Sequence, residues 1–160
     1  MRMDTENIVA LGNTERTEVP LILAVEDDRD NQLLLEYALA MFGWRYLIAA
    51  NAIAAIALAK ERQPNLILLD IILPQISGLQ IALMLKSHQQ TQNIPLIAVT
   101  GLTKDRDKEL IFAAGFNDYV SKPFILEELQ QAIASNLRPI PYCKITRPYL
   151  KKTFKKTLLS

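Results

Sequence analysis

The 160 residues are half hydrophobic and 22% charged, a composition that suits one well-packed domain and excludes an intrinsically disordered chain. The net charge of +1 is unevenly distributed, because residues 21–137 hold nine basic and thirteen acidic side chains, whereas residues 138–160 hold seven basic and no acidic ones. The single cysteine, Cys143, excludes an intrachain disulfide.

The chain shows no segment that would target it to a membrane. Its N-terminus is polar and acidic, unlike a signal peptide, and no apolar run approaches the roughly 20 residues of a membrane span. Residues 1–19 are polar without a sustained period, which predicts a flexible leader. We expect a cytoplasmic protein.

Short apolar runs of the length typical of strands begin after Pro20. Several are nearly continuous rather than alternating, as in strands that are covered on both faces of a sheet. The five predicted strands are residues 21–25, 46–50, 66–69, 96–99 and 119–120.

Segments with helical periodicity lie between these runs, and most are flanked by residues that cap or end a helix. In the first of them, Leu34, Ala38 and Met41 form one apolar face. Asp28 and Asp30 are expected to be solvated or to cap this helix. The predicted helices are residues 30–42 (ended by Gly43), 52–62 (capped by Asn51), 78–87 (after Ser77), 104–114 (capped by Thr103, ended by Gly115) and a fifth from Leu126, with Leu129, Ile133 and Leu137 on its apolar face.

Strand and helix therefore alternate five times between residues 20 and 137, which we expect to form one domain. This alternation predicts a parallel sheet with helices on both faces. In such sheets, the residues that bind ligands lie on loops at the carboxyl ends of the strands.

Polar residues directly follow four of the predicted strands. Glu26 and Asp27 follow the first, Asp70 the third and Thr100 the fourth, while Lys122 comes after Ser121 at the end of the fifth. Three carboxylates that converge on one edge repel one another, and a single lysine does not balance them. A hard divalent cation with oxygen ligands would do so, which points to Mg²⁺.

A cation beside a carboxylate, a hydroxyl and a lysine indicates phosphoryl chemistry. The cation and the lysine can neutralise the oxygens of a transferring phosphoryl group, and a carboxylate can attack it to form an acyl phosphate. Asp70 is the expected nucleophile, because it stands alone at the end of a buried strand.

The segments that carry these residues resemble response-regulator receiver domains of two-component signalling. The four matching stretches are "LILAVEDDRDN", "LILLDIILPQISG", "IAVTG" and "DYVSKPF", in this order along residues 20–137. The resemblance implies an α/β, flavodoxin-like doubly wound (βα)5 fold, with a five-stranded parallel sheet of strand order 2-1-3-4-5.

The resemblance also implies a role for each site residue. Asp70 matches the phosphoacceptor and, with Glu26 and Asp27, a Mg²⁺ ligand. Asp27 would bind the ion directly and Glu26 mostly through water, while Ile72 would contribute its backbone carbonyl.

Three further positions match the switching parts of the family. Thr100 matches the hydroxyl that moves to the phosphoryl oxygen, Tyr119 the aromatic whose rotamer reports that movement, and Lys122 the partner of the phosphoryl group. The Lys122–Pro123 bond is expected to be cis, as in the family. Gly101 stands where the family often has alanine, and a small residue there leaves the phosphoryl group accessible.

The implied protein is a phosphorylation-switched signalling domain with no independent substrate turnover. It would take its phosphoryl group from a sensor histidine kinase or a histidine phosphotransfer protein. A downstream protein or a second copy would then bind through residues 104–137.

Other interpretations remain open at this stage. A phosphorylation-independent pseudo-receiver is one, although the full set of Asp27, Asp70, Thr100 and Lys122 argues against it. In a flavodoxin-like carrier, the acidic residues after the first strand would repel the flavin phosphate. An aspartyl-nucleophile phosphatase would need a second aspartate where Ile72 stands.

The basic tail, residues 138–160, is compatible with several functions. Leu150, Phe154 and Leu158 recur every four residues among four lysines, which predicts a short amphipathic helix. The alternatives are a frayed solubilising end, docking to the body or to a partner, and contact with anionic lipid or nucleic acid. The tail is too short for a helix-turn-helix domain, and nucleic acid is not the expected partner.

Overall fold

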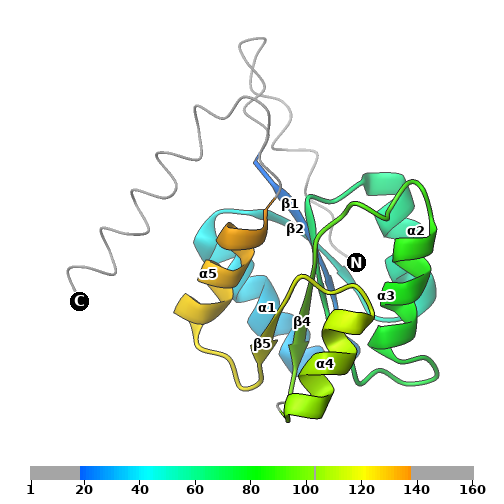
Figure 1. Ribbon diagram of the computed structural model, residues 1–160. Helices are drawn as coiled ribbons and strands as arrows, with labels where there is room; N and C mark the ends of the chain where they lie inside the picture. The colour runs from blue at the N-terminus through cyan, green and yellow to red at the C-terminus, as the bar shows by residue number, and fades with distance from the viewer. Residues whose placement is uncertain (1–18, 103, 138–160) are drawn as a thin grey trace. The chain divides into compact units, whose positions relative to one another are not determined.

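The computed structural model describes residues 19–102 and 104–137, and within this range residues 20–137 form one compact unit (Figure 1). The predictions for the leader and for the basic tail fall outside the described residues, Val19 excepted. The strands are β1 (Leu21–Val25), β2 (Arg45–Ala49), β3 (Leu66–Leu69), β4 (Leu96–Thr100) and β5 (Asp118–Ser121). The helices are α1 (Arg29–Phe42), α2 (Ala52–Arg62), α3 (Gly78–Ser87), α4 (Asp105–Ala113) and α5 (Leu126–Asn136).

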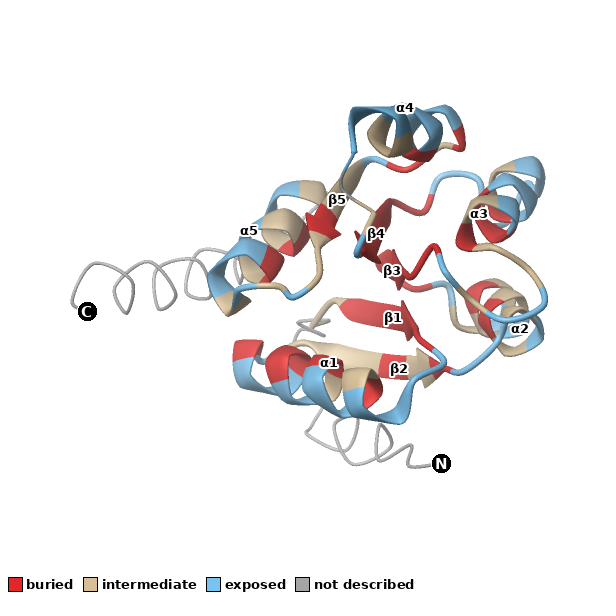
Figure 2. Cartoon of the chain, turned by 90° about the horizontal axis from the view of Figure 1, so that it is seen from below, coloured by how far each residue is buried: buried red, intermediate tan, exposed pale blue. Residues whose placement is uncertain are grey.

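The five strands form one parallel sheet in the order β2-β1-β3-β4-β5, which confirms the predicted fold class. Helices α1 and α5 cover one face of the sheet, and α2, α3 and α4 cover the other (Figure 2). The strand order reverses between β1 and β3, so the loops that follow these two strands flank a topological switch point.

The core of the α1 and α5 side is continuous across the sheet. Strands β1, β3 and β4 are buried along their whole length, as their unbroken apolar runs predict. Full burial of one side chain such as Leu39 contributes about 1.5–3 kcal/mol to the free energy of unfolding. The buried cluster comprises Ile22, Ala24, Leu35, Ala38, Leu39, Phe42, Leu66, Leu68, Ile97, Val99, Val120, Leu129 and Ile133.

Helix α1 is capped as expected but buries a different face from the one predicted. Asp28 is its N-cap and accepts a hydrogen bond from the Asn31 N–H, and Gly43 ends it with a left-handed backbone, φ 82°. Leu34 and Met41 are 48% and 51% exposed, so the prediction that they share the buried face with Ala38 is wrong. The buried residues are Gln32, Leu35, Ala38, Leu39 and Phe42, which recur at helical spacing one position further along.

The caps of α2 and α3 agree with the sequence, and that of α4 does not. Asn51 caps α2, and Ser77 caps α3 in a reciprocal capping box with Gln80. Helix α4 begins at Asp105 with Lys104 as its N-cap and without a side-chain cap hydrogen bond. The predicted cap, Thr103, lies outside the described residues, and the predicted start at residue 104 is one residue early.

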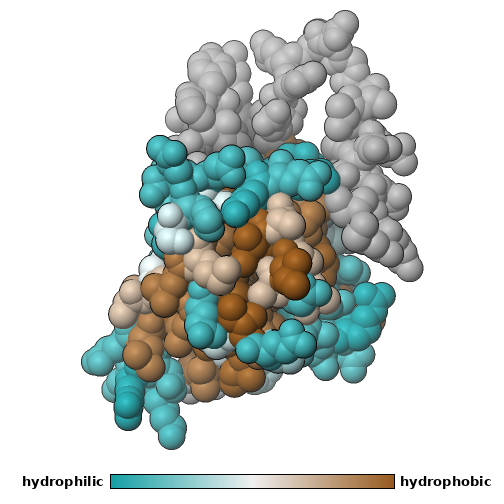
Figure 3. Space-filling model, turned by 90° about the vertical axis from the view of Figure 1, so that its right-hand side faces the viewer, coloured by the Kyte–Doolittle hydropathy of each residue, from teal (hydrophilic) through white to brown (hydrophobic). Residues whose placement is uncertain are grey.

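Apolar side chains also reach the surface. They gather on the face that α2 and α3 form (Figure 3). Ile53 of α2 and Leu83 and Met84 of α3 are exposed large hydrophobic residues of these helices. Among the described residues, no helix combines the length and the apolar character that crossing a bilayer requires.

Among the described strands, β5 forms one edge of the sheet and pairs with β4 alone. The Tyr119 N–H donates to Asp118 Oδ1 of the same strand at 2.8 Å. The other carboxylate oxygen of Asp118 accepts from Asn136 Nδ2 of α5 at 3.0 Å. This carboxylate therefore joins the edge strand to the last turn of α5.

Candidate functional site

The parallel sheet brings the predicted acidic residues together at its carboxyl edge. Glu26 and Asp27 follow β1, and Asp70 follows β3, on either side of the switch point. One carboxylate oxygen from each lies within 4.8 Å of the others. Glu26 and Asp70 are buried, while Asp27 is exposed. Three converging carboxylates, one of them open to solvent, form a donor set that fits a hard divalent cation.

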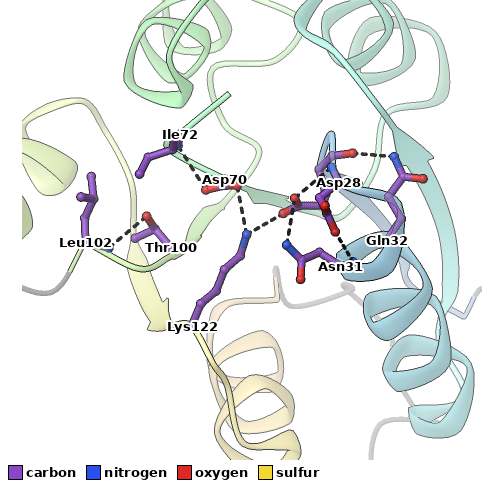
Figure 4. A network of polar contacts seen from close by, with 9 residues as sticks. Asp28, Asn31, Gln32, Asp70, Ile72, Thr100, Leu102 and Lys122 are labelled. Carbon is purple, nitrogen blue, oxygen red and sulfur yellow. Dashed lines mark hydrogen bonds and ion pairs between the residues drawn. The ribbon is translucent and has the colours of Figure 1, made fainter. Parts of the chain in front are cut away.

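Lys122 joins two of these carboxylates. Its ammonium donates to Glu26 Oε2 at 2.7 Å and to Asp70 Oδ2 at 3.0 Å (Figure 4). Burial lowers the pKa of Lys122, but the hydrogen bonds to Glu26 and Asp70 outweigh this effect, so the pKa lies above its usual value of 10.5. The Lys122–Pro123 bond is cis, as the resemblance implied.

The Asp70 carboxylate is held from both sides. Its Oδ1 accepts a hydrogen bond from the Ile72 N–H at 3.1 Å, while its Oδ2 faces Lys122. The Asp70 N–H donates to Val25 O at 3.2 Å, which ties the loop after β3 to the end of β1. The carboxylate of Asp70 thus lies next to both the lysine and the acidic pair.

Gly78, the first residue of α3, lies directly against the backbone of Asp70. A Cβ at position 78 would lie 2.1 Å from Asp70 O and 2.8 Å from the Ile71 Cα, closer than real Cβ atoms approach any atom. The Gly78 N–H also donates to Ile71 O at 2.8 Å. The helix can reach the loop that carries Asp70 only because residue 78 has no side chain.

Ile72 lies beside the cluster through its backbone. Its side chain is 63% exposed, and its N–H is the group that binds Asp70. The predicted contribution of its carbonyl to a metal site stays a prediction.

Thr100 and Gly101 lie at the end of β4. Thr100 is fully buried, and its hydroxyl accepts one hydrogen bond, from the Leu102 N–H at 3.3 Å. Among the described residues, a Cβ at Gly101 would meet no atom within 4 Å apart from its chain neighbours, so the exposed position 101 is open. Figure 4 shows Thr100 on the opposite side of Asp70 from Asp28.

Tyr119 takes no part in the hydrogen bonds of the acidic cluster. Its ring packs edge-on against Phe112 of α4, with centroids 6.1 Å apart, and Lys108 Nζ lies 5.1 Å from the ring centroid. The interaction with Tyr119 raises the pKa of Lys108. The tyrosine therefore links β5 to α4, and its predicted switching role stays a prediction.

Two residues at the site were not singled out from the sequence. Gln32 is buried at 7% exposure, and its Nε2 donates to Glu26 O at 2.7 Å. Asn31 Nδ2 lies 3.4 Å from Glu26 Oε1. Gln32 could have been singled out as the one amide among apolar residues on the buried face of α1. The sequence alone did not show which face of α1 is buried.

Comparison with known proteins agrees with this geometry. Residues 22–134 match the family model described as the response regulator receiver domain. The polar-differentiation response regulator DivK of Brucella anthropi is 35% identical over 116 residues, which cover 72% of this chain and 94% of that protein. The transcriptional regulator RpaA of Synechocystis is 35% identical over 120 residues, 75% of this chain but only 50% of the relative.

Solved structures show the same architecture. The receiver domain of a Pseudomonas aeruginosa sensor histidine kinase, described with a magnesium ion in its active-site cleft, is 32% identical with a TM-score of 0.69, over 74% of this chain and 97% of that domain. The chemotaxis protein CheY4 of Vibrio cholerae has a TM-score of 0.72 over 75% of this chain and all of its own, and at 23% identity it bears on the fold alone.

Proposed function

Because this chain belongs to the response regulator receiver domain family of two-component signalling, we propose that it accepts a phosphoryl group on Asp70 and signals through a changed protein-binding surface. The observation that carries the proposal is the position of the Asp70 carboxylate. It lies 3.0 Å from the Lys122 ammonium and within a cluster of three carboxylates.

The reaction requires little more than positioning by the protein. A carboxylate oxygen of Asp70 attacks the phosphorus of a phosphohistidine, so a P–O bond forms while the P–N bond breaks, and the imidazole leaves with the bonding electron pair. Lys122 then pairs with an oxygen of the new acyl phosphate. Glu26, Asp27 and Asp70 would hold Mg²⁺, which when bound supplies positive charge to the phosphoryl oxygens.

The donors in this proposal are a sensor histidine kinase or a histidine phosphotransfer protein. The acyl phosphate would shift an equilibrium between two conformations in which Thr100 and Tyr119 take different positions. Support comes from the contact of Tyr119 with Phe112 and Lys108, because a movement of its ring changes what α4 packs against.

The surface proposed to respond is residues 104–137, which would bind a downstream protein or a second copy. A hollow of about 450 Å³ lies on this surface between β5 and α5. Asp118, Tyr119 and Glu128 are among the residues that line it. A hollow next to Tyr119 is a place where a partner could detect a change in that ring.

The test is phosphorylation of the full chain by acetyl phosphate, followed by phosphate-affinity gel electrophoresis with and without Mg²⁺. We expect a retarded band that requires Mg²⁺ and is lost in Asp70→Asn. The matched control is Asp30→Asn, which removes an exposed carboxylate from the first turn of α1 and should leave the band intact.

Absence of the band from a folded wild-type protein would contradict the proposal and favour a pseudo-receiver that binds its partners without phosphate. A band that persists in Asp70→Asn would contradict the assignment of Asp70.

A further inference from the structure

Glu26 accepts hydrogen bonds at its backbone carbonyl and at both carboxylate oxygens. It is only 1% exposed. Its backbone carbonyl accepts from Gln32 Nε2 at 2.7 Å, and its Oε1 accepts from the Asp28 N–H at 3.2 Å and from Asn31 Nδ2 at 3.4 Å. Its Oε2 accepts from Lys122. The N-cap and first turn of α1 therefore hold the carbonyl and one carboxylate oxygen, and Lys122, which follows β5, is the partner of the other oxygen (Figure 4).

Gln32 occupies a position that packing alone would fill with an apolar residue. It shares the buried face of α1 with Leu35 and Leu39. An amide is costly to bury unless its hydrogen bonds are made, and both ends of this one are engaged. Its Nε2 binds Glu26 O, and its Oε1 accepts from Arg29 Nη1 at 3.3 Å. The amide thus fixes the backbone of Glu26 at the point where the strand becomes the loop.

The two sets of donors differ in what happens to them during the proposed reaction. Lys122 is shared between Glu26 and Asp70, and a phosphoryl group on Asp70 would draw this ammonium toward its own oxygens. Glu26 Oε2 would then lose its cationic partner. The donors from α1 do not contact Asp70, so they can stay in place.

We propose that Asn31 and Gln32 are positioning residues that hold Glu26 in place for a divalent cation, independently of Lys122. This inference rests on the proposed function. Gln32 acts on the Glu26 backbone and Asn31 on its carboxylate, and neither contacts the phosphoryl group. Hydrogen-bonded neighbours that orient a metal ligand usually change metal affinity about 10–100-fold when they are removed.

The experiment measures binding of Mn²⁺ to the full chain, from the electron paramagnetic resonance signal of the free ion, without any phosphodonor. Gln32→Leu keeps the volume and suits the apolar face, and we expect it to raise the Kd for Mn²⁺ about tenfold. Asn31→Ala, at a partly exposed position, should raise it by a smaller factor. Both effects should persist in a Lys122→Met background.

Thr91→Val is the matched control. Thr91 is fully buried, and its hydroxyl donates to Leu85 O at 2.6 Å, so this variant also loses a side-chain hydrogen bond to a backbone carbonyl, but away from the cluster. Its Kd for Mn²⁺ should equal that of the wild type, and urea unfolding of each variant without metal compares their stabilities.

The outcomes separate the inference from the proposed function. A wild type that binds no Mn²⁺ would contradict the metal site itself. Binding within twofold of wild type in both Gln32→Leu and Asn31→Ala would overturn the positioning role alone. Equal weakening in Thr91→Val would overturn it as well, because the effect would then follow general loss of stability. If Gln32→Leu does not fold, the Asn31→Ala result decides.

Discussion

Helices α1 and α4 each follow a strand whose end carries site residues, yet they are held to the domain very differently. Helix α1 has 14 residues, a side-chain N-cap and five buried residues. Helix α4 has nine residues, all of them described, with no side-chain cap hydrogen bond and Ile111 as the single buried position. The stability of a helix in a protein comes mainly from the apolar face that it buries. Helix α4 is therefore the element that can move at the lower cost.

The site residues next to α1 and those next to α4 also differ in how many hydrogen bonds hold them. On the α1 side, Glu26 accepts hydrogen bonds at its carbonyl and at both carboxylate oxygens. On the α4 side, the Thr100 hydroxyl accepts one hydrogen bond, and there is free space at Gly101. Elements that move in a response come from the less stable part of a fold. The carboxylate proposed to help hold the cation is thus fixed by several hydrogen bonds, and Thr100, which is proposed to respond to the phosphoryl group, accepts only one.

Core truncation should show the largest difference between the two helices. Leu39→Ala on α1 removes a fully buried side chain and should lower the free energy of unfolding by about 2–5 kcal/mol. Phe112→Ala on α4 removes a ring that is 48% exposed and should cost less than about 1.5 kcal/mol, mostly from the lost contact with Tyr119. Urea unfolding measures both, and equal losses would contradict the comparison.

Gly78 and Gly101 allow the loop that carries Asp70 to be compared with the loop that follows β4. Gly78→Ala places a Cβ against the Asp70 carbonyl, so the backbone must shift, and we expect a loss of about 2–3 kcal/mol together with slower phosphorylation. Gly101→Ala meets no atom and should stay within about 0.5 kcal/mol of wild type. A tolerated alanine at position 78 would show that the Asp70 loop is less constrained than its contacts indicate.

Changes at the two N-caps should have smaller effects on stability, and of opposite sign. Removing the cap of α1 should destabilise that helix, and adding one to α4 should stabilise it. Asp28→Ala removes the side-chain cap of α1 and should lower the free energy of unfolding by about 1 kcal/mol. Lys104→Ser introduces a capping hydroxyl at α4 and should slow hydrogen exchange of the α4 amides severalfold, with about 0.5–1 kcal/mol of added local stability. Unchanged exchange in α4 would mean that its opening does not depend on its first turn.

Lys122, which follows β5, pairs with Glu26 and Asp70. Its contribution to the free energy of unfolding should decrease at high pH. Its pKa in the folded protein is above 10.5, since hydrogen bonds to Glu26 and Asp70 outweigh burial. A base whose pKa is raised on folding stabilises the protein fully below its unfolded pKa, and this stabilisation disappears as the pH rises through the folded pKa. The stability gap between wild type and Lys122→Met should therefore be constant from pH 7 to 9 and narrow above pH 10.5. A gap that widens there would contradict this assignment.

The sequence predicted most of the elements because three of the five strands are continuous apolar runs and the caps at Asn51 and Ser77 are local signals. It did not predict which face of α1 is buried, because Leu33, Leu34 and Leu35 are consecutive and only the sheet decides among them. The N-cap of α4 was predicted one residue early, because threonine is the better capping residue by type, whereas the helix has Lys104 as its N-cap and no side-chain cap hydrogen bond.

The site was predictable where it depends on strand ends and not where it depends on contacts between loops. The positions of Glu26, Asp70 and Lys122 follow from a parallel sheet. The approach of Gly78 to the Asp70 carbonyl and the hydrogen bond from Gln32 to Glu26 depend on how a helix meets a loop, which local periodicity does not encode.

The hydrogen bond between the Tyr119 N–H and its neighbour Asp118 has a consequence for how this protein behaves at high concentration. An open strand edge offers unpaired amides on which the strand of another molecule can assemble. At this edge a carboxylate already occupies one such amide and adds negative charge, and Asn136 keeps it in place. We therefore expect the Asp118 carboxylate to disfavour edge-to-edge association, next to the Tyr119 ring through which the domain is proposed to signal.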